Sequence, residues 1–210
     1  MYFWDQSFIM IQFSDLDLSK TYTYADYLQW TFEDRLELIK GYIFKMSPAP
    51  AELHQRILTN VGNEIYNNLK GKPCRVYFAP FDVRLVRKSK QDREITTVVQ
   101  PDICVICDPQ KIDKKGCLGA PDIVVEILSP GNNKKELKNK YEVYEEAGVK
   151  EYWIIHPSEK TFFKYVLDKN GQFQPTNLLT LGDHITSLIL PGFALSLDEV
   201  FADRPNEITD

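Results

Sequence analysis

The spacing of apolar residues along the chain alternates between the period of a helix and that of a strand. Over residues 51–69 the apolar positions recur every fourth residue, which predicts an amphipathic helix of about five turns. A second helix is predicted over 134–147. The predicted strands are the hairpin 36–46, the interrupted run 75–86, the apolar runs 98–108, 121–128 and 152–157, and a hairpin that turns at Asn170 and Gly171.

This order of elements combines hairpins with a strand–helix–strand crossover. We therefore expect an α/β (α+β) fold with a mixed central sheet flanked by helices. The 210 residues, 43% hydrophobic and 26% charged, fit one globular domain with a sizeable core. Within it we expect an N-terminal extension and hairpin at 1–50, a core at 51–157, and a C-terminal hairpin and tail at 158–210.

Composition narrows the class of protein further. No apolar run reaches the roughly 20 residues that span a bilayer, and the first residues lack the pattern of a signal peptide. We therefore expect a cytoplasmic protein with neither a membrane partner nor an organic cofactor. The four cysteines fit a reducing compartment, and Cys104 and Cys107 lie three apart in a predicted strand, so they face opposite sides and do not form a zinc pair.

The net charge and the local distribution of charge point in different directions on whether the protein binds nucleic acid. A net charge of -5 argues mildly against a protein that binds nucleic acid by charge alone. The stretch 84–93 is nevertheless basic, and its candidate phosphate contacts are Arg84, Arg87, Lys88 and Lys90. An ordinary solvated loop is the alternative interpretation.

Two predicted strands carry carboxylates where buried residues are expected. Asp102 lies in the first strand, and Glu126 lies in the second on the face opposite Ile123, Val125 and Ile127. Antiparallel pairing of the two strands would bring both carboxylates to one sheet end, where they can hold Mg²⁺. The alternative is that Glu126 lies at a sheet edge or pairs with a lysine or arginine.

Helical geometry selects one lysine as their partner. On the helix 134–147, Val143, Tyr144 and Ala147 define an apolar face that includes Lys140, whereas Lys138 points away. A lysine facing the two carboxylates can stabilise the charge that develops on an attacked phosphate. A lysine that merely covers apolar surface is the alternative.

Three segments together carry a resemblance to a known family. They are the run PDIVVEILSP, the following helix with Lys140 and Tyr144 before AGVKEYWIIHP, and the upstream LELIKGYIFKMSPAPAELH. This combination resembles the Uma2 (DUF820) family of restriction endonucleases, a branch of the PD-(D/E)XK nuclease superfamily, over nearly the whole chain.

The resemblance implies a restriction-endonuclease-like fold and roles for four residues. Asp102 and Glu126 would be the paired acids and the ligands of Mg²⁺ or Mn²⁺. The lysine usually found two residues beyond the second acid is replaced by Leu128, and Lys140 takes its place. Glu37 looks like a supplementary acid, with an exposed strand glutamate as the alternative.

The expected function is therefore that of a metal-dependent endonuclease that hydrolyses DNA, and a homodimer suits the cutting of two strands. One alternative is an inactive nucleic-acid-binding or regulatory module of the same fold, and another is a protein-interaction partner whose carboxylates serve structure only. His54 begins the helix 51–69 beside its apolar stripe and is interpreted as a hydrogen-bonded structural histidine, with a histidine that points into the cleft as the alternative. Three other polar residues are set aside: His156 and His184 have no partner at metal-ligand spacing, and Asp122 lies towards the loop end of its hairpin.

Overall fold

The centre of the computed structural model is a six-stranded mixed sheet, in which only β9 and β10 run parallel. The structure describes residues 12–46, 51–86, 89–129 and 134–203, the side chains of 134–136 excepted. In spatial order the strands are β12 (Phe173–Pro175), β11 (Thr161–Leu167), β10 (Glu151–His156), β9 (Ile123–Ile127), β6 (Ile103–Ile106) and β3 (Arg75–Phe78).

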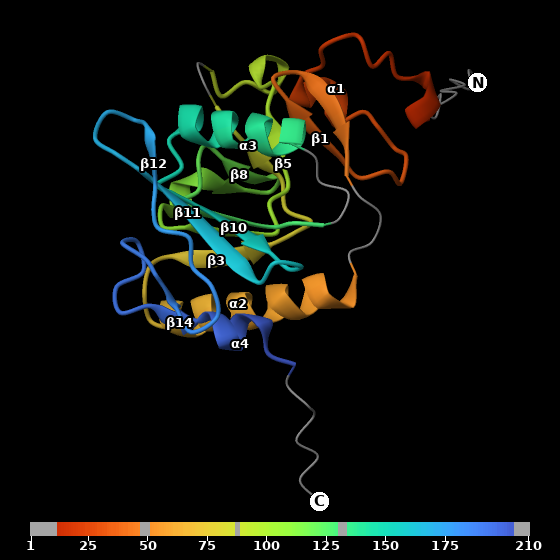
Figure 1. Ribbon diagram of the computed structural model, residues 1–210. Coiled ribbons are helices and arrows are strands. Elements are labelled where there is room, and N and C mark those ends of the chain that lie inside the picture. The colour runs from red at the N-terminus through yellow and green to blue at the C-terminus, as the bar shows by residue number, and fades with distance from the viewer. Residues whose placement is uncertain (1–11, 47–50, 87–88, 130–133, 204–210) are drawn as a thin grey trace, which may run out of the picture.

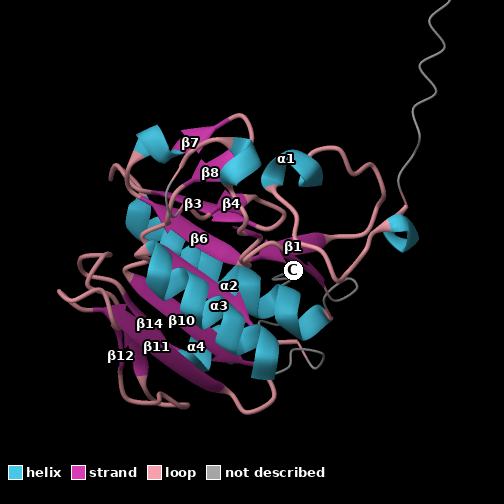
Figure 2. Ribbon diagram, turned by 90° about the horizontal axis from the view of Figure 1, so that it is seen from above, coloured by secondary structure: helices cyan, strands magenta, loops and turns pink. Residues whose placement is uncertain are grey.

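A second six-stranded sheet lies beside the first, at the opposite end of the molecule from β11 and β12 (Figure 2). It is antiparallel apart from the pair β4 and β8. Its spatial order is β2 (Tyr42–Lys45), β1 (Leu36–Ile39), β5 (Val98–Val99), β4 (Val83–Arg84), β8 (Gly116–Leu118) and β7 (Ile112–Asp113). A separate hairpin consists of β13 (His184–Thr186) and β14 (Ala194–Ser196).

Helices cover both faces of the central sheet (Figure 1). The α-helices are α1 (Tyr24–Tyr27), α2 (Glu52–Leu69), α3 (Lys134–Ala147) and α4 (Leu197–Phe201), and short 3₁₀ helices occupy Phe13–Asp15, Asp92–Glu94 and Pro109–Lys111. One core packs α2, α4 and the β13–β14 hairpin against one face. The second core packs α3 and the second sheet against the other. None of the described helices is both long and apolar enough to cross a membrane.

Alternation along β9 decides which core each of its residues joins. Ile123, Val125 and Ile127 belong to the core under α2, whereas Val124 packs in the core under α3. Glu126 shares the face of Val124, as its position in the strand predicts. The sheet therefore presents Glu126 to α3.

The helix α2 packs closely on β3 because its sequence provides a glycine at the contact. A Cβ atom at Gly62 would lie 2.3 Å from the Phe78 ring, so a larger residue fits there only if the ring or the strand moves. The predicted apolar positions of α2 face the core as expected, with Ile57, Val61 and Ile65 fully buried.

Two sequence predictions about strands are wrong in detail. The run 98–108 is not one strand, because β5 belongs to the second sheet and β6 to the central sheet. Pro101 lies where the chain crosses over and has no N–H to continue a ladder. The connection between the predicted strands 98–108 and 121–128, for which the sequence predicted no strand, contributes β7 and β8 to the second sheet.

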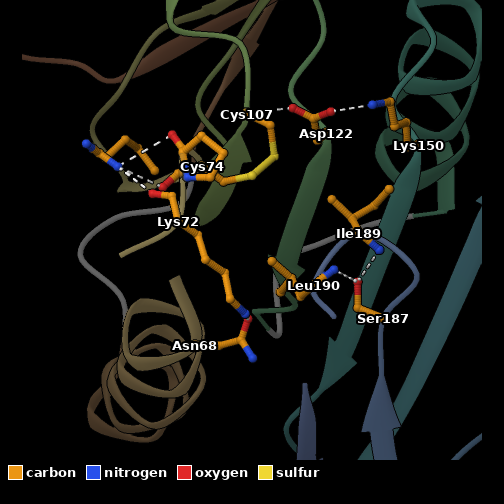
Figure 3. The surroundings of a disulfide bond; sticks show 11 residues. Asn68, Lys72, Cys74, Cys107, Asp122, Lys150, Ser187, Ile189 and Leu190 are labelled. Carbon is orange, nitrogen blue, oxygen red and sulfur yellow. Dashed lines mark hydrogen bonds and ion pairs between the residues drawn. A yellow bond between two sulfur atoms is a disulfide. The ribbon is translucent and has the colours of Figure 1, made fainter. Parts of the chain in front are cut away.

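Two of the four cysteines form a disulfide, which the sequence analysis did not predict. Cys74 and Cys107 form a disulfide beside the β3–β6 pair, where Arg75 and Ile106 are register partners (Figure 3). Cys104 and Cys107 do not act as a metal pair, because Cys104 is buried and reduced while Cys107 is bonded to Cys74.

The predicted hairpin at 170–171 is present, but its first strand β11 pairs with β10. It therefore extends the central sheet instead of standing apart from the core.

Candidate active site

Side chains from both sheets and from α3 meet in one buried cluster. Glu37 comes from β1, Asp102 from the residue before β6, Glu126 from β9 and Lys140 from α3. We call these four residues the carboxylate–lysine cluster. Glu37, Glu126 and Lys140 are only 2%, 7% and 4% exposed, so their charges are compensated by one another and not by bulk water.

Lys140 contacts two of the three carboxylates of this cluster. Its Nζ lies 3.0 and 3.1 Å from the two carboxylate oxygens of Glu126 and 3.1 Å from Oε2 of Glu37. Burial alone would lower the pKa of Lys140, but the Glu126 and Glu37 carboxylates outweigh it and hold that pKa well above its usual value. The lysine is therefore a permanent cation, facing the sheet as its helical position predicts.

The surroundings of Glu126 disfavour its charged form. Burial raises the pKa of the Glu126 carboxyl to about 7, although the Lys140 ammonium opposes the rise. The nearby carboxylates of Asp102 and Glu37 add to it. The Tyr144 hydroxyl donates a hydrogen bond of 2.7 Å to Glu126 Oε1 and partly stabilises the carboxylate.

Glu37 is a buried member of the site, not an exposed strand glutamate. Its Oε1 accepts a hydrogen bond of 2.8 Å from the backbone N–H of Gln100, while Oε2 faces Lys140. Both carboxylate oxygens therefore have a donor, and the side chain is fixed between the second sheet and α3.

Two hydrogen-bond donors fix the Asp102 carboxylate, which lies beside Glu126. The backbone N–H of Ile127 donates to its Oδ2 at 2.7 Å, and Nε2 of His54 lies 3.3 Å from its Oδ1. Because Ile127 follows Glu126 directly in β9, the antiparallel pairing of β6 with β9 brings the two acids together as predicted.

His54 belongs to this site, although its sequence position suggested a structural histidine. It is buried at the first turn of α2, and its Nδ1 has no hydrogen-bond partner among the residues that the structure describes. Burial opposes the imidazolium, but the hydrogen bond and charge of Asp102 raise the pKa of His54 above its usual value. The imidazole therefore acts as a partner for the Asp102 carboxylate.

Asp122 plays a structural role at the other end of β9. It accepts hydrogen bonds of 2.7 Å from the backbone N–H of Cys107 and from Nζ of Lys150 (Figure 3). This arrangement agrees with its interpretation as a residue outside the site.

The candidate phosphate contacts are only partly described. Arg84 is not in an exposed loop: it lies in β4, is 2% exposed, and its guanidinium pairs with Asp113 and the carbonyl of Cys117. Its charge is compensated by the Asp113 carboxylate within the protein, so we do not retain Arg84 as a nucleic-acid contact. Lys90 is exposed, and Arg87 and Lys88 lie outside the described residues.

Sequence reasoning missed two residues of the site. Gln100, whose N–H holds Glu37, lies in a crossover that no local pattern reveals. Tyr152 is buried, and its hydroxyl has no hydrogen-bond partner among the described residues. Its pKa is raised well above normal, first by burial and then by the Glu126 charge.

The carboxylates of the cluster are oxygen ligands of the kind that a divalent cation prefers. Three carboxylates with one lysine and one histidine leave at least one negative charge uncompensated, which is consistent with the raised pKa of Glu126. Among the described residues, no three histidine, cysteine or carboxylate side chains could enclose an ion by themselves. Mg²⁺ fits such a site because it needs only one or two carboxylates and keeps water or phosphate oxygens as its other ligands.

Comparisons with known proteins bear on the fold and the family of this chain. A crystal structure from Anabaena variabilis, named as "a putative nuclease belonging to DUF820", has a TM-score of 0.68 at 21% identity over 86% of this chain and 97% of its own. It shares the fold. An uncharacterised protein from Synechocystis is 26% identical over 121 residues, which are 57% of this chain and 60% of that relative's length. The family model Uma2, described as "Putative restriction endonuclease", matches residues 24–198. The chain therefore belongs to the Uma2 family.

Proposed function

We propose that this protein is a metal-dependent endonuclease that hydrolyses phosphodiester bonds in DNA. The observation that carries the proposal is the contact of one buried lysine with two carboxylates beside a third. A lysine that only stabilised the fold would need one buried partner, and the extra carboxylates would raise the free energy of the folded protein. Membership of a family described as a restriction endonuclease supports the same function.

Asp102 and Glu126 are the residues that would hold Mg²⁺ or Mn²⁺, with Glu37 as a supplementary acid. When bound, the ion lowers the pKa of a water molecule and offsets negative charge on the attacked phosphate. The hydrogen bonds to Asp102 from Ile127 and His54 keep its carboxylate oriented before any ion arrives.

Lys140 would supply the positive charge that phosphodiester hydrolysis requires. Because Glu126 and Glu37 fix its ammonium group, it can orient the attacking water and stabilise the added negative charge of the pentavalent phosphorane. Tyr144 limits the rotation of Glu126 through their hydrogen bond. These groups are oriented before substrate binds, so little reorganisation accompanies the reaction.

DNA as the substrate rests on the family description. Lys90, with Arg87 and Lys88 outside the described residues, stays a predicted contact to the phosphate backbone. A homodimer stays a prediction too, since two-fold symmetry suits the cutting of two strands.

The alternative is a binding module without hydrolysis. It is motivated by Leu128, which occupies the position two residues beyond Glu126 where the superfamily usually has its lysine. Lys140 weakens this alternative, because its amino group contacts Glu126 from a different element, the helix α3. The two functions differ in whether DNA is cut.

A cleavage assay distinguishes these functions. Supercoiled and single-stranded DNA are incubated with Mg²⁺, Mn²⁺ or EDTA and with the parent, Glu126→Gln or Glu159→Gln protein. Glu159 is exposed in the β10–β11 turn and provides a matched control. Metal-dependent cleavage by the parent and the control, lost in Glu126→Gln, is expected. Equal cleavage by Glu126→Gln would refute the site, and DNA binding without cleavage by the parent would favour the binding module.

A further inference from the structure

Arg35 lies on the same face of the β1–β2 hairpin as the site acid Glu37. The ladder of hydrogen bonds in this hairpin includes Arg35, the residue directly before β1, because the backbone N–H of Met46 donates to the carbonyl of Arg35 at 3.0 Å. Residues two apart in a strand share a face and are separated by about 7 Å. Arg35 therefore borders the carboxylate–lysine cluster, on the strand that packs against α3 (Figure 1).

The guanidinium of Arg35 has an unusual environment for an exposed cation. It donates to Oε1 of Gln100 through Nη2 at 3.0 Å and Nε at 3.4 Å, and in the described part of the chain no carboxylate pairs with it. Asp34, the preceding residue, pairs with Lys45 instead. The other cation of this hairpin, Lys40, also has carboxylate partners. The charge of Arg35 is thus oriented but not neutralised.

Gln100 fixes this orientation from inside the protein. The side chain is buried, and its Nε2 donates to Oδ1 of Asp82 at 2.9 Å and to the Tyr27 hydroxyl at 3.3 Å. Because these acceptors take the amide nitrogen, Oε1 must face Arg35. The backbone N–H of the same residue holds Glu37. One glutamine therefore positions both the arginine and the acid.

We propose that Arg35 binds a backbone phosphate of the nucleic-acid substrate next to the site of hydrolysis. The N–H groups of its guanidinium that do not face Gln100 remain for a bidentate contact with phosphate oxygens, for which the planar guanidinium is suited. An uncompensated cation beside an anionic cluster attracts the phosphate toward the cluster. This inference rests on the proposed nuclease function and assigns a substrate contact to it.

Salt-dependent DNA binding tests the inference. Binding of a fluorescently labelled 20-base-pair duplex is measured by anisotropy in EDTA, over a range of salt concentrations, for the parent, Arg35→Gln, Arg35→Lys and Arg75→Gln. Arg75 is the matched control, since it is also exposed and its Nη1 donates to neutral acceptors, the backbone carbonyls of residues 72–74, at the end of the β3–β6 pair away from Asp102. Arg35→Lys keeps the charge but loses the bidentate geometry.

We expect Arg35→Gln to raise the Kd about tenfold, because glutamine can still donate one hydrogen bond to phosphate but lacks the second bond and the charge of the bidentate contact. The slope of log K against log salt should fall in magnitude by about 0.9, as for one lost phosphate contact. Arg35→Lys should keep the slope with an intermediate Kd, and Arg75→Gln should match the parent. Unfolding temperatures equal to that of the parent would show that the variants are folded.

The outcomes separate this inference from the nuclease function. An unchanged Kd and salt slope in folded Arg35→Gln, with a parent that cleaves DNA, would overturn the phosphate contact alone. An Arg35-dependent slope in a parent that does not cleave would uphold the contact and overturn hydrolysis. A parent that neither binds nor cleaves DNA would overturn both.

Discussion

Removal of the Lys140 charge should destabilise the folded protein strongly, through the two carboxylates that it contacts. In Lys140→Met, Glu126 and Glu37 stay buried without their partner, and breaking a buried pair in this way costs about 3–5 kcal/mol. Because the pKa of Glu126 is already about 7, proton uptake there limits the loss. We expect a loss of about 3 kcal/mol at pH 8 and a smaller loss at pH 5.5, where Glu126 is protonated in both proteins.

Urea unfolding followed by circular dichroism measures this loss. For a slope of about 2 kcal/mol per molar urea, the midpoint should fall by about 1.5 M at pH 8. Lys138→Met is the control on the same helix, since that side chain is 73% exposed and its substitution should change stability by less than about 0.5 kcal/mol. A Lys140→Met protein within 1 kcal/mol of the parent at both pH values would refute the idea that Lys140 compensates the buried acids.

Three further predictions concern the pH dependence of the site and the packing of α2. Mg²⁺ binding should strengthen from pH 6 to pH 8, since Glu126, with a pKa of about 7, must lose its proton; calorimetry in buffers of different ionisation enthalpy should detect proton release, and its absence would contradict the assignment. In His54→Ala the loss of stability in urea should be larger at pH 6 than at pH 9. The raised pKa of His54 means that its pairing with Asp102 stabilises the protein below the unfolded pKa, about 6.5, and is lost as pH rises through the folded value, so an equal loss at both pH values would count against it. Gly62→Ala should cost about 1–3 kcal/mol in thermal unfolding because its Cβ meets the Phe78 ring, and an unchanged melting temperature would mean that β3 can shift.

The local geometry of the site could be predicted from the sequence wherever burial decides the direction of a side chain. Alternation in β9 correctly separates Glu126 from Val125 and Ile127, and the helical period correctly turns Lys140 toward the sheet and Lys138 away. These predictions succeed because one face of each element is apolar and must be covered.

Long-range pairing could not be predicted in the same way. The run that contains Asp102 is apolar on both sides, so its pattern does not reveal that it divides between two sheets at Pro101. Arg84 was misjudged for a related reason: a residue's charge does not tell whether its partner comes from a distant strand. The same limit left both interpretations of His54 open until its contact with Asp102 was known. No local sequence pattern predicts that Gln100 belongs to the site, because its hydrogen bond to Glu37 forms only where the two sheets meet.

Binding of Mn²⁺ to the carboxylate–lysine cluster decides whether the proposed hydrolysis has its metal site. Electron paramagnetic resonance of free Mn²⁺ gives the affinity of the parent, Glu126→Gln and Glu159→Gln proteins in the absence of DNA. We predict that the parent and Glu159→Gln bind Mn²⁺ equally well, and that Glu126→Gln binds at least about tenfold more weakly, since it lacks one of the two proposed carboxylate ligands. Equal binding by all three proteins, or no binding by the parent, would contradict a metal site at Glu126.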